Sequence, residues 1–125
     1  MKKIPLFILF GLAIFLNGCA SMEKINEEYG MIQYADGINQ KEAKLIAQVH
    51  LMESRYTSSF DPYKADIITT PETLAHRNLW FVDFPAQDTL SDTHHLVIVD
   101  KRTGGILRSR PYTFQYQTDY DWALK

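Results

Sequence analysis

The chain is poor in cysteine and has no strong excess of charge of either sign. One cysteine in 125 residues excludes an internal disulfide framework and any CxxC metal or redox site. A formal net charge of -2 leaves no basic surplus to neutralise phosphates, so we expect no nucleic-acid partner. Hydrophobic residues are 46% and charged residues 22% of the chain, which indicates one small globular domain.

The N-terminal residues have the pattern of a secretory signal. Two lysines precede the apolar run Ile4 to Leu16, which is shorter than the roughly 20 residues of a membrane-spanning helix and suits the core of a signal peptide. The run ends in Leu16-Asn17-Gly18-Cys19, and with these residues the chain resembles a bacterial lipoprotein. The resemblance implies that residues 1–18 are removed as a signal peptide. It also implies that Cys19 becomes the first residue and is acylated, which anchors the protein to membrane lipid.

The position of Cys19 suits a lipid anchor. Each buried CH2 group contributes about 0.8 kcal/mol, so several acyl chains hold a protein at a membrane essentially permanently. The alternatives are an uncleaved signal anchor and a chance cysteine after an apolar run. Ala20, rather than an aspartate, follows the cysteine. By resemblance to Gram-negative lipoproteins this implies the outer membrane of the cell envelope, with the protein facing the periplasm.

We expect residues 19–38 to form a tether with a short amphipathic helix, and residues 39–125 to form a single α+β domain. Four apolar residues of the tether fall at helical spacing: Met22, Ile25, Tyr29 and Ile32. The helix either packs on the domain, forms part of a stalk, or contacts a partner or a membrane surface. Its acidic polar face argues against a membrane contact, because interfacial helices usually have Lys and Arg there.

The clearest helix signal of the chain follows Asn39. Asn39 and Glu42 have the spacing of a capping box, and the pattern predicts a helix that continues to about Tyr56. Its apolar side contains Leu45, Ile46, Val49, Met52 and Tyr56, with Ala43 at the edge. His50 lies on the border of that side, where a packed histidine is favoured over a catalytic one.

Four later segments have strand patterns: Ala65–Thr70, Asn78–Phe84, Thr93–Asp100 and Ile106–Arg110. Pro71 stops the first segment or places it at an edge. The third contains four consecutive apolar residues, as expected of a central strand covered on both faces. A glycine pair before the fourth predicts a tight hairpin. A helix followed by a meander of strands predicts an α+β fold in which the helix packs on a curved antiparallel sheet.

Short strings between Asn39 and Arg110 combine helix, strand and hairpin signals. They are Lys41-Glu42-Ala43 with Ile46-Ala47, Trp80-Phe81-Val82, Val97-Ile98-Val99-Asp100 and Thr103-Gly104-Gly105-Ile106-Leu107. Together they resemble the small secreted PepSY-like and NTF2-fold immunity-type domains. The resemblance implies a cystatin- or NTF2-like fold and an inhibitory or protein-binding role, with no shared catalytic residues. The chain departs from this pattern in the long segment from Ser58 to Ala75 and in its aromatic C-terminal end.

The C-terminal end alternates aromatic and polar residues, which is the periodicity of a strand. The aromatic positions are Tyr112, Phe114 and Tyr116, followed by Tyr120 and Trp122. One interpretation is a further strand that covers the sheet. The other is a surface that contacts a protein partner, because Tyr and Trp are enriched in interface hot spots. We take these five aromatic residues as the candidate partner-binding residues.

No set of residues in the sequence converges on catalysis, a metal or a cofactor. His94 and His95 are adjacent, so in a strand they point to opposite faces and cannot easily bind one ion. Asp83 and Asp100 are a candidate carboxylate pair across neighbouring strands, although aspartates at strand ends are commonly solvated. The serines lie in no G-x-S-x-G motif, and the glycine pair lacks the strand-to-helix context of a phosphate loop. We therefore expect no enzyme activity, no metal site and no cofactor.

These patterns favour an envelope lipoprotein whose small domain binds a protein partner. A specific form is an immunity or inhibitor protein, anchored where a toxin or hydrolase acts so that its effective concentration is high. Two alternatives remain open. A hollow between helix and sheet, lined by Trp80, Phe84 and His50, would serve a small-ligand carrier or an enzyme. A purely structural envelope lipoprotein would need neither a hollow nor a specific partner.

Overall fold

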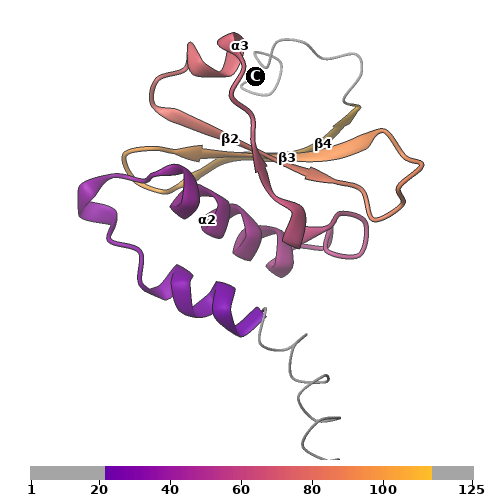
Figure 1. Cartoon of the computed structure of the whole chain (residues 1–125), viewed down its shortest axis with the longest axis horizontal. Helices are drawn as coiled ribbons and strands as arrows, with labels where there is room; N and C mark the ends of the chain where they lie inside the picture. Colours follow the sequence, from indigo (N-terminus) through magenta and orange to yellow (C-terminus); the bar gives the residue numbers. More distant parts are fainter. Residues whose placement is uncertain (1–21, 114–125) are drawn as a thin grey trace, which may run out of the picture.

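The computed structural model describes residues 22–113, which form an antiparallel sheet with helices on both sides (Figure 1). Residues 22–30 are helical. The later elements are η1 (Tyr34–Asp36), α2 (Gln40–Glu53), η2 (Pro62–Lys64), β1 (Asp66–Ile67), α3 (Pro71–Leu74), β2 (Leu79–Pro85), β3 (Thr93–Asp100) and β4 (Ile106–Thr113). The α+β class predicted from the sequence is confirmed.

The sheet is an open meander in the order β1-β2-β3-β4, and each neighbouring pair of strands is antiparallel. Figure 1 shows the helical segment 22–30 and α2 on one side of the sheet and α3 on the other. We call these the α2 side and the α3 side. The segment 22–30 lies outside α2, so the α2 side consists of two helical layers over the sheet.

The capping box predicted for α2 is confirmed. The Glu42 backbone N–H donates to Asn39 Oδ1 at 2.8 Å, and the Asn39 backbone N–H donates to Glu42 Oε1 at 3.0 Å. These bonds satisfy donors that the first turn of a helix leaves free. The helix ends at Glu53, before the predicted end at Tyr56. It ends there because the Ser54 backbone is extended and the Ser54 hydroxyl donates to a carbonyl of the last turn.

α2 is buried on two sides, whereas the sequence pattern predicted one apolar side. Its buried residues are Ala43, Leu45, Ile46, Ala47, Val49 and Leu51. Ala47 and Leu51 are fully buried in the cluster that packs against the sheet. Leu45 instead lines a groove with Ile32, which follows the helical segment 22–30. Tyr29 and Ile32 pack against the same core, so the helix predicted in the tether is one that packs on the domain.

β3 is an interior strand that is covered on both faces, as its apolar run predicted. The consecutive residues His95 to Val99 are fully buried. On the α2 side, the strand residues of the core include Val82, Phe84, Val97 and Val99. On the α3 side, the buried cluster contains Phe81, Leu96, Ile98 and Tyr112. The side chains of β2 and β3 therefore alternate between two apolar layers, as expected of strands that are covered on both faces.

Two strands differ in length from their predictions. β1 has only two residues, because Thr70 and Pro71 begin the short helix α3 that the sequence did not indicate. Thr70 caps α3, and Pro71 occupies its first turn, where a missing N–H costs no helical hydrogen bond. β4 continues past Arg110 to Thr113 and includes Pro111. A proline is tolerated there because β4 is an edge strand among the described residues.

The predicted hairpin between β3 and β4 is confirmed, and it depends on Gly104. This glycine has a φ of +76°, and a Cβ atom at this position would lie 2.6 Å from the Tyr34 ring. Asp100 also stabilises the turn, because its Oδ1 accepts a hydrogen bond from the backbone N–H of Arg102 at 2.7 Å. The turn therefore requires a residue that has no side chain and tolerates positive φ.

Candidate functional site

A row of three polar side chains crosses the α3 side of the sheet, one each from β2, β3 and β4. These are Asp83, His94 and Tyr112, which we call the polar row. His94 Nδ1 lies 2.7 Å from Asp83 Oδ2, and the Tyr112 hydroxyl donates to Asp83 Oδ1 at 2.5 Å. When Asp83 is ionised its carboxylate can only accept, so His94 Nδ1 then carries the proton. Asp83 and Tyr112 are 8% and 5% exposed. The hydrogen bonds that join the three strands are therefore largely buried.

Burial dominates the electrostatics of the polar row. It raises the pKa of Asp83 above the ordinary value of 3.8, while the hydrogen bonds from Tyr112 and His94 act in the opposite direction. Asp66, which lies opposite Asp83 on β1, raises the pKa further. Because the net shift is upward, folding favours the protonated carboxyl over the ionised one.

The polar row contains an imidazole oriented by a carboxylate. Hydrolases use this arrangement for general-base catalysis, because the carboxylate holds the imidazole in one tautomer. Here the carboxylate is shared with Tyr112, so both of its oxygens are engaged inside the sheet. The His94 side chain is 22% exposed, and its ring lies 6.0 Å from the ring of Tyr112. The main effect of these hydrogen bonds is structural: the bond from Tyr112 to Asp83 links β4 to β2 across β3.

The structure places Tyr112 differently from the role that the sequence suggested for it. Tyr112 is buried, and its hydroxyl donates to Asp83, which makes it an internal anchor of β4. The other four candidate partner-binding residues lie outside the described residues: Phe114, Tyr116, Tyr120 and Trp122. Cys19 also lies outside them. β4 ends at Thr113, directly after this anchored tyrosine.

The carboxylate pair considered in the sequence does not form. Asp83 lies opposite Leu96, whereas Asp100 lies opposite Leu79 at the other end of β2, so these two carboxylates do not face each other. The polar row itself was missed, because it depends on the register between β2 and β3. The only signal in the sequence was strand alternation, which places Asp83 and His94 on the same face in this register and in any register shifted by two residues, so it does not specify the pair.

His95 points to the α2 side, away from His94, as predicted. It is fully buried, and its ring centroid lies 4.7 Å from that of Tyr56 and 5.2 Å from that of Phe60. A hydrogen bond of 2.7 Å joins His95 Nε2 to Ser109 Oγ, whereas Nδ1 has no hydrogen-bond partner among residues 22–113. Burial lowers the pKa of His95 from 6.5 to about 4, and the neighbouring His50 adds to this effect. The fold therefore holds a neutral imidazole.

The space between α2 and the sheet is filled by side chains. The core cluster there includes Ala43, Ala47, Leu51, Val82 and Phe84, each fully buried. Trp80 packs against this cluster and donates its Nε1–H to the Ile38 carbonyl at 2.7 Å. The hollow that the sequence allowed near Trp80 and Phe84 is thus occupied by the core.

Within residues 22–113, no group of three or more His, Cys, Asp and Glu side chains could hold a metal ion. In the same part of the chain, no helix has both the length and the apolar character needed to cross a bilayer. Comparisons with protein-family models, with curated proteins and with solved structures gave no match. The resemblance to PepSY-like and NTF2-fold domains therefore stays a prediction.

Two substitutions at Asp83 separate its charge from its hydrogen bonds. Asp83→Ala removes the acceptor that serves Tyr112 and His94, and we expect the free energy of unfolding at pH 7 to fall by about 1–3 kcal/mol. Asp83→Asn keeps the shape and an acceptor without the buried charge, so we expect a free energy of unfolding at pH 7 that equals or exceeds that of the native chain. Urea unfolding measures both.

The pH dependence tests the same point. Because the pKa of Asp83 is raised by folding, its favourable contribution is complete below pH 3.8 and is lost as the pH rises through the folded pKa. The Asp83→Asn variant should therefore gain stability relative to the native chain as the pH increases from about 4 to about 7. If the native chain instead became more stable relative to Asp83→Asn over the same pH range, this result would contradict a raised pKa of Asp83.

His95 should make the fold sensitive to acid. Its pKa is lowered by folding, so its contribution is present above pH 6.5 and is lost as the pH falls toward about 4, for a total of about 3 kcal/mol. His95→Gln keeps a group that can bond Ser109 but does not titrate, and we expect its free energy of unfolding to fall less over this range. His50→Gln removes one cause of the lowered pKa of His95, so its loss of stability in acid should lie between those of the native chain and His95→Gln. Equal acid dependence in all three proteins would rule out His95 as the cause.

Proposed function

We propose that the chain is a lipid-anchored lipoprotein of the bacterial cell envelope whose α+β domain binds a protein partner. The anchor is an acylated Cys19 after removal of residues 1–18, and the membrane is the outer membrane, with the protein facing the periplasm. The specific form is an immunity or inhibitor protein that neutralises a toxin or hydrolase. The observation that carries the binding role is the filled space between α2 and the sheet.

A carrier or enzyme that works between helix and sheet needs a chamber large enough to enclose most of its ligand. In this protein the corresponding volume is taken by fully buried side chains of α2 and β2, such as Leu51 and Phe84. This volume therefore offers no chamber for a small ligand. The outer surface of the domain stays available for binding, and a protein partner would bind there.

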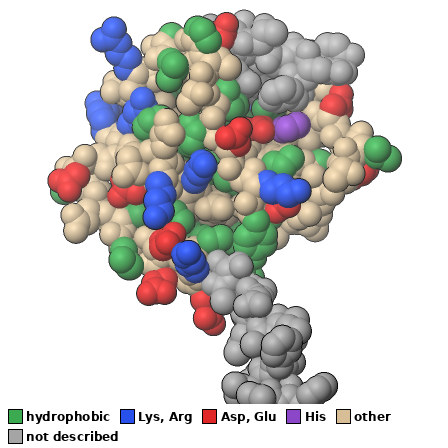
Figure 2. Space-filling view, in the orientation of Figure 1, with side chains coloured by type: hydrophobic (Ala, Val, Ile, Leu, Met, Phe, Trp, Pro, Cys, Tyr) green, Lys and Arg blue, Asp and Glu red, His purple; other side chains and the backbone are tan. Residues whose placement is uncertain are grey.

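The polar row supports a role for the aromatic residues that follow it. Tyr112 is fixed to Asp83, so the aromatic residues that follow it start from a defined point in the fold. A segment with a fixed start has less conformational entropy to lose on binding, and this improves affinity. Figure 2 shows acidic and basic side chains interspersed over one face of the domain. A surface of mixed charge favours recognition through aromatic contacts over steering by a field of one sign.

The anchor is tested by mass spectrometry of the chain produced in a Gram-negative host. We expect the mature protein to begin at Cys19, with the mass of the attached acyl chains, and to fractionate with membranes. The Cys19→Ser variant lacks the thiol that accepts the lipid and should leave the membrane fraction as an unacylated protein. A native protein with residues 1–18 still attached and a free thiol would refute the anchor.

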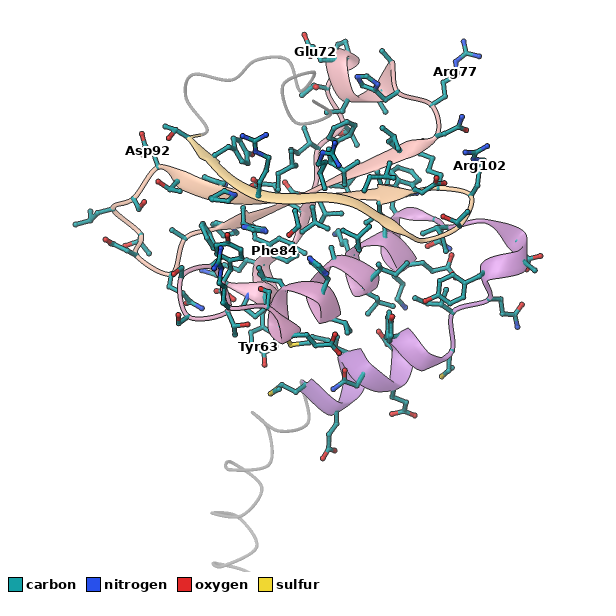
Figure 3. The ribbon with its side chains drawn as sticks, turned by 180° about the vertical axis from the view of Figure 1, so that it is seen from behind. Tyr63, Glu72, Arg77, Phe84, Asp92 and Arg102 are labelled. Atoms are coloured by element: carbon teal, nitrogen blue, oxygen red, sulfur yellow. The ribbon has the colours of Figure 1, made fainter. Side chains whose placement is uncertain are left out.

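The partner is tested by crosslinking and capture from envelope extracts. We expect the double substitution Tyr120→Ala and Trp122→Ala to reduce recovery of the partner about tenfold or more, because aromatic hot-spot residues each contribute well over 1 kcal/mol. Tyr63→Ala is the matched control, since Tyr63 is 49% exposed and lies on the α2 side of the sheet (Figure 3). Equal recovery with the double variant would exclude these residues, and the absence of any reproducible partner would refute the binding role.

A further inference from the structure

We infer that the anchored protein lies with its α2 side toward the bilayer and holds the α3 side of the sheet away from it. This orientation rests on the proposed acylation of Cys19 and extends it. It makes the lipid surface the neighbour of the helical segment 22–30. It also leaves the polar row and the end of β4 on the side of the sheet that faces away from the membrane.

The first reason is the short reach between the anchor and the folded domain. Met22, the first described residue, follows Cys19 by three positions in the sequence. A fully extended chain spans at most about 3.6 Å per residue, so the acylated residue lies within about 11 Å of Met22. The bilayer surface must therefore be close to the start of segment 22–30, whatever conformation residues 20 and 21 adopt.

The second reason is that segment 22–30 does not act as a loose linker. It is helical, and Tyr29 at its end packs against the core together with Ile32. Backbone bonds close its last turn, where the Met31 N–H donates to the Glu28 carbonyl at 3.1 Å. A continuous helix therefore links Met22 to the packed Tyr29, and this helix sets where the anchor point lies relative to α2 and the sheet.

The third reason is the order of the layers. Figure 1 shows segment 22–30 outermost on the α2 side, followed by α2, the sheet and α3. Figure 3 shows the same separation in side chains, with Tyr63 on the α2 side and Glu72 and Arg77 on the α3 side. Packed helices lie about 8–10 Å apart, and the sheet lies beyond α2, so the far face of the sheet is more than about 10 Å more distant from the bilayer than segment 22–30.

The side chains of the membrane-facing side suit this arrangement. Met22 and Met31 are 46% and 70% exposed, and apolar side chains of this kind can enter the headgroup region of a bilayer. Segment 22–30 has three glutamates and one lysine, so anionic headgroups do not attract it. The acyl chains rather than charge hold this side at the surface, and the orientation should not change with salt concentration.

Two cysteine reporters on opposite sides of the sheet test the orientation. Acylation consumes the thiol of Cys19, so each variant has one free thiol for a fluorescent donor. Met31→Cys labels the α2 side, and Leu74→Cys, at a residue that is 54% exposed, labels the α3 side. The acylated full-length chain is placed in phosphatidylcholine vesicles that carry an acceptor dye on the headgroups. Asn26→Cys, exposed on segment 22–30, is a second reporter in case the first variant folds poorly.

We expect energy transfer to the membrane to be several times more efficient from positions 31 and 26 than from position 74, at low and at high salt. In detergent without the acceptor, the donors should have equal emission. Equal transfer from both sides, or stronger transfer from position 74, in protein that floats with the vesicles would overturn the orientation and leave the anchor intact. Protein that carries no lipid and does not float would overturn the anchor, and the orientation with it.

Discussion

The burial of β3 on both faces is the constraint on which the rest of this structure depends. Five consecutive residues, His95 to Val99, have no exposure to solvent, and such a strand needs cover on both sides. α2 supplies cover on one side, and the cluster around Phe81 and Tyr112 supplies it on the other. Each aliphatic side chain removed from water contributes about 1.5–3 kcal/mol. Burial of this one strand is therefore a large part of what stabilises the sheet.

The same burial shifts the pKa values of two buried polar residues of the sheet. Asp83 and His95 lie on opposite faces, and burial favours the neutral form of each. The sheet keeps these residues although their burial costs free energy. For Asp83 the gain is register, because a slip of one residue would move it to the α2 side and leave Tyr112 and His94 without their shared acceptor. The polar row thus specifies which residues pair, while the apolar layers supply most of the stability.

The sequence predicted the features that depend on neighbouring residues. The capping box at Asn39, the bounds of β3 and the turn at Gly104 follow from local chemistry, and all three are confirmed. It did not predict α3, where Pro71 acts as the start of a helix rather than the end of a strand. It also did not predict the second buried side of α2, because the position of segment 22–30 over Leu45 is a tertiary contact.

The polar row shows the same limit for the candidate site. Each of its members could be assigned to a strand from the sequence, but the distances among them depend on how the loop between β2 and β3 sets the register. Strand alternation alone allows Asp83 to pair with several residues of β3. A site built across three strands therefore needs the pairing of those strands, which no local pattern in this chain encodes.

The two-sided burial of α2 has a consequence for an anchored protein. A long flexible tether would let the domain present every face to the periplasm equally. Here Tyr29 of segment 22–30 packs against the core cluster that α2 forms with the sheet, so a constraint applied near Met22 is transmitted to the sheet through this cluster. In the proposed orientation, the membrane and the proposed partner would meet opposite sides of one sheet. Binding at the end of β4 would then require no change in the position of the anchor, and a large partner could approach without contact with the bilayer.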